Sequence, residues 1–247
     1  MQPLTDFVWT GAVPEQQLDH QMTRVANLFS NLKTGIAKLE RQFQAQVETK
    51  TVRHPFPYLT SYTEYGTSNS VDLLYEKRLH FDPLRNTTAI FSANDTMGRR
   101  LFIKFTSRYN VKAHLLLAEA GYAPQLLGLK KLQCGTLMVI MAYIDGSSMY
   151  QSHFSTNDLD RVRKAMEILH MENLVFGDLR VNNIFKPNDG SEVLLVDFDW
   201  CGEHGVGRYP PSLNHDSDCG WHEEVERGGI MRKAHDIHLF DQLPREP

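Results

Sequence analysis

Two neighbouring stretches decide the fold of this chain: VFGDLRVNNIF at residues 175–185 and VLLVDFD at residues 193–199. In the first, short apolar runs typical of buried strands flank a polar loop; in the second, an apolar run ends at an acidic residue. The loop carries Asp178, Asn183 follows it by five residues, and Asp197 follows Asn183 by fourteen. Either motif alone also fits a surface turn that uses Asp and Asn for local hydrogen bonds. Together, at this spacing, they indicate a shared site.

These residues resemble the catalytic loop (H-R-D-x-x-x-x-N) and the metal-binding D-F-G of the protein-kinase-like superfamily. The resemblance implies that Asp178 orients the attacking hydroxyl, while Asn183 and Asp197 hold Mg²⁺ against the phosphates of ATP. Phe176-Gly177-Asp178 replaces His-Arg-Asp, and a glycine before the aspartate is the form of choline-kinase and aminoglycoside-kinase relatives. The chain as a whole resembles kinase-like proteins abundant in fungi, with a shortened C-lobe.

The composition is that of an ordinary folded protein of 247 residues, 41% hydrophobic and 23% charged. Its net charge of −4 gives no electrostatic reason to expect nucleic acid or an anionic membrane as a partner. No apolar run reaches the roughly 18 residues of a membrane span, and the N-terminus lacks a secretory apolar region. Three cysteines are too few and too scattered for a disulfide framework. We therefore expect an intracellular, cytoplasmic protein with reduced cysteines.

The expected architecture is α+β: a two-lobed protein-kinase-like fold with an antiparallel N-lobe sheet and a mainly helical, truncated C-lobe. A long N-terminal helix precedes it. The expected divisions are a helical extension with its connector at 1–60, an N-lobe reaching the hinge at 61–144, and a shortened C-lobe at 145–247.

A long amphipathic helix is predicted over residues 15–48, because apolar side chains recur there every three or four positions. These are Leu18, Met22, Val25, Leu28, Leu32, Ile36, Leu39, Phe43 and Val47. Such a helix either lies along its own domain or docks a partner helix. The spacing is mixed rather than strictly heptad, which favours the first alternative over a coiled coil. A helix-mediated protein partner stays open.

Strands are expected at residues 71–75, 88–91 and 101–105, the last two joined by a hairpin turn at 94–98. By resemblance, Lys104 occupies the position of the lysine that pairs the α- and β-phosphates of ATP. A lysine within an apolar strand needs an anion if it is buried. The alternative is a side chain that alternates outward to solvent.

Two parts of the kinase pattern are missing from this half of the chain. The turn expected to cover the phosphates, residues 82–87, contains no glycine, so its amides cannot close over phosphates as tightly as a glycine-rich loop. The helical glutamate that should pair with Lys104 is also absent. Between Lys104 and Asp145 the only carboxylate is Glu119, whereas the expected position is nearer Asn110. These departures put catalysis in question.

A buried strand over residues 137–144 leads into Gly146 and resembles the inter-lobe hinge. The resemblance implies that backbone groups from Ala142 to Ile144 hydrogen-bond adenine, and that Asp145 reaches the ribose or only shapes the turn. A helix then begins after capping residues at 155–158 and ends near residue 170, which brings the chain to the catalytic loop.

Two charged residues beside the motifs have alternative roles. Arg180 is placed to neutralise charge on the transferring phosphate, or else forms a salt bridge that shapes the loop. Asp199, in place of the glycine of D-F-G, adds charge near the metal or caps the next segment.

The C-terminal part is short, since 48 residues follow Asp199. A final helix is expected at 234–243, where Asp236 could support the catalytic loop. One rival constellation is also present: Cys201 and His204, and Cys219 and His222, form two Cys-x2-His pairs with zinc-ligand spacing.

The hypothesis that these observations favour is an ATP- and Mg²⁺-dependent phosphotransferase. Asp178, Arg180 and Lys104 would be catalytic, and the acceptor would be a protein Ser/Thr or a small alcohol. The alternative is a pseudokinase that binds nucleotide or protein as a scaffold.

Overall fold

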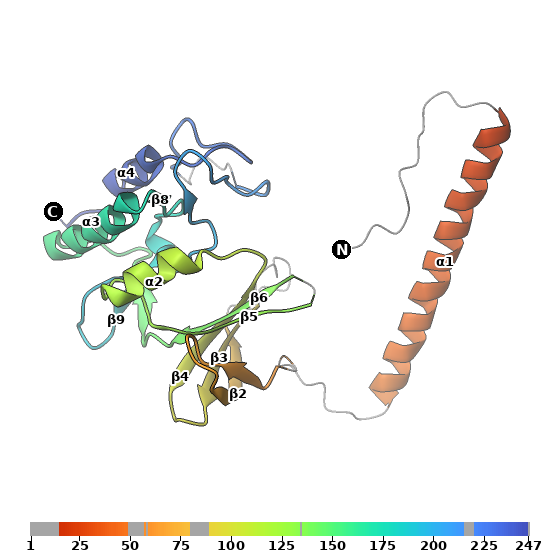
Figure 1. The fold of residues 1–247 in the computed structure, drawn as a ribbon, viewed down its shortest axis with the longest axis horizontal. Helices are drawn as coiled ribbons and strands as arrows, with labels where there is room; N and C mark the ends of the chain where they lie inside the picture. The colour runs from red at the N-terminus through yellow and green to blue at the C-terminus, as the bar shows by residue number, and fades with distance from the viewer. Residues whose placement is uncertain are drawn as a thin grey trace. The chain divides into compact units, whose positions relative to one another are not determined.

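The computed structural model describes residues 15–48, 57, 59–79, 89–133, 135–214 and 220–246 (Figure 1). The chain divides into two compact units, residues 1–55 and 56–247. Most of the predicted connector at 51–60, the glycine-free turn at 82–87 and Cys219 lie outside the described residues.

The first unit contains helix α1 (Glu15–Glu48), which confirms the helix predicted over the same residues. Of its apolar stripe, Met22, Leu32, Ile36 and Leu39 are exposed, with between 44% and 64% of their surface accessible. No helix in the described part of the chain combines the length and the apolar character that crossing a membrane requires.

The second unit begins with an antiparallel sheet whose strand order, within the described residues, is β1-β2-β3-β4-β6-β5. The strands are β1 (Ser61–Thr63), β2 (Ser70–Leu79), β3 (Ala89–Asp95), β4 (Arg100–Thr106), β5 (Leu126–Lys131) and β6 (Leu137–Ala142). The β3–β4 pairing confirms the predicted hairpin. At its turn, one carboxylate oxygen of Asp95 accepts the main-chain N–H groups of Met97 and Arg99, both at 2.9 Å.

Strand β4 places its side chains alternately on the two faces of the sheet. Leu101 and Ile103 are fully buried in an apolar core with Phe91 and Ile140. Phe102 and Lys104 face the other way and line a cavity. The alternation therefore turns Lys104 toward the rest of the unit and not toward solvent.

Beyond the sheet, the described part of the second unit contains three helices, and most of its other residues lie in loops and short strands. Its helices are α2 (Val111–Glu119), α3 (Thr156–Met171) and α4 (Lys233–Asp241), close to the predicted positions. Helix α3 begins with a capping box in which Ser155 and Asp158 bond each other's main-chain N–H. Figure 1 shows α2 between the sheet and the pair formed by α3 and α4.

Short strands fix the loops that carry the motifs. They are β7 (Gly146–Ser148), β8 (Leu174–Val175), β9 (Ile184–Pro187), β10 (Leu194–Leu195) and β11 (Gly202–Glu203). Strand β9 pairs with β10 and β7, and β8 pairs with β11. The catalytic-loop stretch thus runs from β8 through the 3₁₀ turn η1 (Val181–Asn183) into β9, so its polar residues lie between two anchored strands.

Candidate functional site

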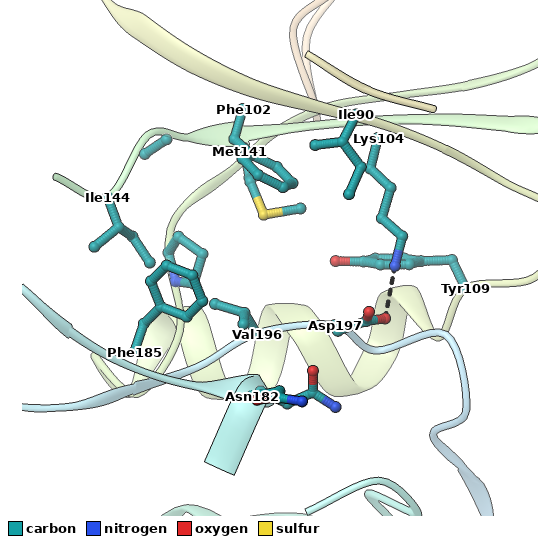
Figure 2. Close-up of a pocket in the computed structure, with 13 residues that line it drawn as sticks. Ile90, Phe102, Lys104, Tyr109, Met141, Ile144, Asn182, Phe185, Val196 and Asp197 are labelled. Carbon is teal, nitrogen blue, oxygen red and sulfur yellow. Dashed lines mark hydrogen bonds and ion pairs between the residues drawn. The ribbon is translucent and has the colours of Figure 1, made fainter. Parts of the chain in front are cut away.

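A cavity of about 270 Å³ lies between the sheet and the two motif stretches. Its lining comes from Ile90, Phe102, Lys104, Tyr109, Pro124, Met141, Ala142, Ile144, Asn182, Asn183, Phe185, Val196 and Asp197. Figure 2 shows that the cavity has two different ends. Ile144 and Phe185 line an apolar end, whereas Lys104 and Asp197 meet at the charged end.

Lys104 is buried and ion-paired with two carboxylates. Its ammonium lies 2.6 Å from Asp197 Oδ1 and 2.9 Å from Asp199 Oδ2. Burial alone would lower the pKa of Lys104, but the two carboxylates outweigh burial and hold that pKa above its ordinary value. The lysine therefore stays charged, and the alternative of an outward-facing side chain is wrong.

Asp197 adopts a backbone conformation that is rare for residues other than glycine. Its φ is 69°, in the left-handed region, which costs roughly 1–2 kcal/mol for an L-residue. The conformation brings the carboxylate to Lys104 while Phe198 is fully buried. Backbone strain of this kind is characteristic of functional sites.

Asp199 supplies Lys104 with the second carboxylate partner that helix α2 does not provide. Besides Lys104, its Oδ2 accepts the Thr106 hydroxyl at 2.8 Å. Burial and the neighbouring Asp197 charge raise the pKa of Asp199 to about 6, although Lys104 opposes the shift. Its Oδ1 is buried and has no hydrogen-bond partner among the described residues. Of the two predicted roles, added charge near the site fits this position.

The helical glutamate is absent from the structure as it is from the sequence. Helix α2 follows the lysine strand, but Asn110 is its N-cap, accepting the Ala113 N–H at 3.0 Å. Farther along, His114 stacks on Phe198 with ring centroids 4.7 Å apart. Its Nε2 lies 2.7 Å from the Pro124 carbonyl oxygen. The helix thus contacts the D-F-D segment through an aromatic ring.

Asn183 lines the cavity, and Asp178 lies next to it. The Asn183 amide nitrogen donates to the Asp178 carbonyl oxygen at 2.9 Å. Asp178 is 7% exposed. Burial raises the pKa of Asp178, and the Arg180 guanidinium reduces this effect without cancelling it.

Arg180 forms a bidentate pair with Asp178. Its Nε donates to one carboxylate oxygen and its terminal nitrogen donates to the other, the latter at 3.0 Å. The guanidinium also lies 5.8 Å from the Trp200 ring and 5.2 Å from the Trp221 ring. Between the two predicted roles of Arg180, this geometry is that of the salt bridge.

Gly177 is required by space as well as by conformation. Its φ is +80°, and an added Cβ would lie 2.2 Å from Met231 Cε.

Asp236 supports the loop that carries Asp178. The N–H groups of Phe176 and Gly177 donate to the Asp236 carboxylate, both at 2.8 Å, and His170 Nε2 lies 3.0 Å from that carboxylate. The support predicted from Asp236 is therefore present.

The hinge residues occupy the apolar end of the cavity. Ala142 and Ile144 line it, whereas Asp145 does not. The Asp145 carbonyl accepts the Asn188 N–H at 2.8 Å, and its carboxylate accepts the Asn188 side-chain amide at 3.4 Å. This placement corresponds to the turn-shaping alternative for Asp145.

Two features of the site were not predicted from the sequence. Tyr109 lines the cavity, and burial raises the pKa of its hydroxyl, with Asp197 adding to the effect. Nothing in the local sequence marks it, because its position depends on the fold. Asp199 was recognised as charged but not as the partner of Lys104.

No protein-family model and no curated protein sequence matches this chain. Structure comparison does find likeness. The structure of the Cydia pomonella granulovirus kinase PK-1 matches with a TM-score of 0.57 and 14% sequence identity. The match covers 69% of this chain and 68% of that one. At this identity the likeness shows the fold alone, and the described chain has a kinase-like fold.

Proposed function

We propose that this protein is an ATP- and Mg²⁺-dependent phosphotransferase. The observation that carries the proposal is the ion pair between the buried Lys104 and Asp197 at the charged end of the cavity, with 2.6 Å between nitrogen and oxygen. A buried lysine that keeps its charge, beside a carboxylate in a strained conformation, suits the binding of phosphate and metal. The kinase-like fold supports the same class of chemistry.

The residues at the two ends of the cavity fit the two parts of a metal–nucleotide complex. Asp197 and Asn183 offer a carboxylate oxygen and an amide oxygen, the hard ligands that Mg²⁺ prefers. At the other end, Met141, Val196 and Phe185 provide an apolar slot for a planar base. ATP would supply the transferable phosphoryl group.

Main-chain groups near Ile144 are suited to recognising the base. The N–H groups of Ala142 and Tyr143 are already used, donating to the carbonyls of Gln125 and Arg100 at 2.9 Å and 3.1 Å. Among the described residues, the N–H of Ile144 has no such main-chain acceptor. It is the donor we assign to adenine.

Asp178 would orient the acceptor hydroxyl and accept its proton. Its raised pKa makes it a better base than an ordinary exposed carboxylate. In the structure Arg180 hydrogen-bonds both carboxylate oxygens of Asp178. An acceptor hydroxyl must therefore displace one of these hydrogen bonds to reach Asp178. The glycine before Asp178, in choline-kinase and aminoglycoside-kinase style, favours a small alcohol acceptor, although Gly177 also has a packing reason. A protein Ser/Thr acceptor remains the other choice.

The bidentate Arg180–Asp178 pair also favours a second candidate function, a nucleotide-binding pseudokinase. A carboxylate held at both oxygens is not free to act as a base. The two functions differ in phosphoryl transfer, not in nucleotide binding.

The first experiment is the change in melting temperature with ATP, with and without Mg²⁺, for wild type and Asp197→Asn. A ligand at about 100 times its Kd stabilises by roughly 2.7 kcal/mol, which is about 5–10 °C for a domain of this size. We expect a Mg²⁺-dependent rise that Asp197→Asn loses. The matched control is Asp189→Asn, an exposed carboxylate outside the cavity, which should keep the rise.

No rise in the wild type at millimolar ATP would overturn both candidate functions. A rise with no ADP formed and no phosphate transferred to protein or to added alcohols would favour the pseudokinase.

A further inference from the structure

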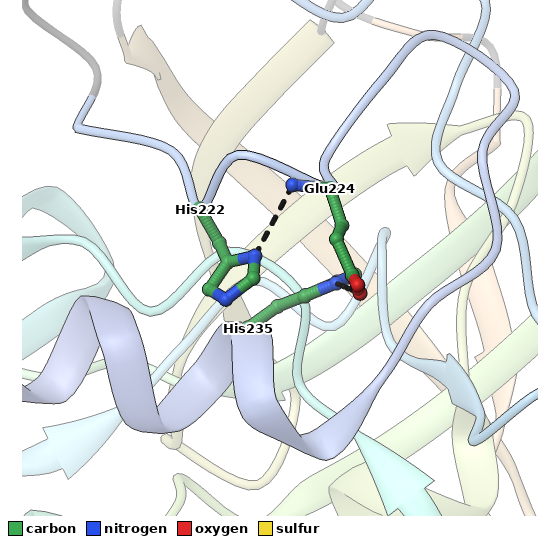
Figure 3. A group of neighbouring side chains, drawn as sticks. All are labelled: His222, Glu224 and His235. Carbon is green, nitrogen blue, oxygen red and sulfur yellow. Dashed lines mark hydrogen bonds and ion pairs between the residues drawn. The ribbon is translucent and has the colours of Figure 1, made fainter.

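A group of metal-ligand side chains lies outside the cavity, at the start of α4. His222, Glu224 and His235 each offer one ligand atom, and these atoms all lie within 4.8 Å of one another. Figure 3 shows the two imidazoles and the carboxylate turned toward a common point. His222 and Glu224 come from a loop, and His235 comes from the first turn of the helix.

His235 supplies an independent reason to expect a ligand. The residue is 1% exposed, and its Nε2 has no hydrogen-bond partner among the described residues. The carboxylate oxygen Glu224 Oε2 lies 3.8 Å from this Nε2, beyond hydrogen-bond range. A buried polar atom without a partner is costly in a folded protein. Something that the protein chain does not provide would satisfy it.

The 3.8 Å separation suits two ligands of one metal ion. Zinc–nitrogen and zinc–oxygen distances of about 2.0–2.2 Å place tetrahedral ligand atoms roughly 3.4 Å apart. The Glu224 side chain is 56% exposed, so it can rotate to close the difference. Its present partner is Arg232, whose Nε lies 3.3 Å from Oε2, and a metal ion would replace that cation.

The second imidazole nitrogen of His235 already has a partner of the kind that metal-binding histidines use. The Tyr209 hydroxyl lies 3.0 Å from Nδ1, and the main-chain N–H of Arg232 donates to the same atom at 3.3 Å. With Nε2 bound to metal, the ring proton would move to Nδ1 and be accepted by Tyr209, and the long hydrogen bond from Arg232 would be lost.

We propose that His222, Glu224 and His235 form a binding site for a divalent transition-metal ion, with Zn²⁺ as its principal occupant. Two imidazole nitrogens and one carboxylate are a zinc ligand set that leaves a fourth position for water. Of the four residues in the two Cys-x2-His pairs, the proposed set retains only His222. Glu224 and His235 are the other two ligands. Cys201 is buried, and His204 Nδ1 accepts the Lys233 N–H at 3.1 Å.

The site is connected to the catalytic loop on both sides. Next to His235, Asp236 holds the N–H groups of Phe176 and Gly177. Next to His222, Trp221 packs 5.8 Å from Trp200, centroid to centroid. Zinc would therefore tie the loop that carries Trp221 to the helix that anchors the catalytic loop. This inference does not depend on the proposed phosphotransferase function.

The test measures Zn²⁺ binding to the full-length chain after chelator treatment, by competition with a chromogenic chelator and by metal analysis. We expect one Zn²⁺ per chain. His222→Gln and Glu224→Gln should each weaken binding by more than about tenfold, the scale of losing even an outer partner of a zinc ligand. Glu223→Gln and His153→Gln, exposed residues outside the group, are the matched controls.

A second readout protects the test against variants that fold poorly. Zn²⁺ should raise the melting temperature of wild type and Glu223→Gln but not that of Glu224→Gln, whose altered side chain is mainly exposed. The proposal fails if the wild type binds no Zn²⁺, or if binding in His222→Gln and Glu224→Gln equals that of the wild type.

Discussion

The ammonium of Lys104, on strand β4, lies 2.9 Å from the carboxylate of Asp199, in the turn that follows Val196. The partner that a kinase-like lysine would find on the neighbouring helix comes here from the D-F-D segment. The same carboxylate is bonded to Thr106, also on β4. The sheet and the D-F-D segment are thereby joined through one acidic residue, Asp199.

Replacing Asp199 by asparagine should weaken nucleotide binding. Lys104 would keep Asp197 but lose its second carboxylate, and a hydrogen bond to a charged group contributes about 1.5–3 kcal/mol. We expect the Kd for Mg²⁺–ATP to rise by about tenfold or more, measured by titration calorimetry at pH 7.5. Asp72→Asn, an exposed carboxylate on β2, should leave the Kd unchanged.

The difference between wild type and Asp199→Asn should also depend on pH. Because the pKa of Asp199 is about 6, lowering the pH through 6 protonates it and removes its ion pair with Lys104. The ratio of the two Kd values should therefore shrink between pH 7.5 and pH 5.5. Protonation of ATP itself affects both proteins and cancels in the ratio. A ratio that stays constant over this range would contradict the pairing role.

Replacing Asp178 by asparagine should separate binding from transfer. The substitution leaves Lys104 and Asp197 in place, so the Mg²⁺-dependent stabilisation by ATP should persist. Loss of a positioned base lowers the rate of transfer by about 10²–10⁴-fold, measured as ADP formation with an accepted alcohol or protein. Equal rates in wild type and variant would exclude Asp178 as the base.

A feature of this structure could be predicted from the sequence when the residues that form it are close together in the chain. Helix α1 and the β3–β4 hairpin follow from periodicity and turn residues, which act over a few positions. The position of Lys104 was expected from the resemblance, but its burial was not, because the sequence also allowed a side chain that faces solvent. The identity of its second partner was not predicted either, since Asp199 lies 95 positions away in the sequence.

The candidate metal site also combines residues that are too far apart in the sequence for a local motif to identify. Local spacing selected His222 through a Cys-x2-His pattern. Its partner His235 is thirteen residues farther on, beyond any fixed motif. The fold brings the two together because α4 begins beside the loop, so the proposed set could be recognised only in three dimensions.

Two glycine-to-alanine variants should separate conformational strain from steric clash. Gly177 and Gly66 have similar positive φ angles, +80° and +74°, but an added Cβ at Gly66 meets nothing within 4 Å. Gly66→Ala should therefore cost about 1–2 kcal/mol, the price of the left-handed conformation alone. Gly177→Ala should cost roughly 1–3 kcal/mol more, because its Cβ would meet the fully buried Met231 side chain and lie 3.1 Å from the Trp200 carbonyl oxygen. Urea unfolding midpoints measure both, and equal losses would show that packing at Gly177 is unimportant.

The stability of the fold should fall in mild acid because of His114. This ring is fully buried between Tyr109 and the Pro124 carbonyl, and burial lowers its pKa from 6.5 to about 4, although the Pro124 hydrogen bond opposes the shift. A depressed pKa means that the unfolded chain takes up the proton first. The contribution of neutral His114 is therefore complete above pH 6.5 and is lost as the pH falls toward 4.

The expected loss attributable to His114 is up to ~3 kcal/mol in the free energy of unfolding. Other groups also titrate over this range, so the measurement is the difference between wild type and His114→Gln in urea unfolding at pH 7.5 and pH 4.5. The variant has its own packing defect at both pH values, but its stability should fall less steeply on acidification. His153→Gln, an exposed histidine, should fall as steeply as the wild type. Parallel losses in wild type and His114→Gln would mean that the buried imidazole is not the group that acid protonates.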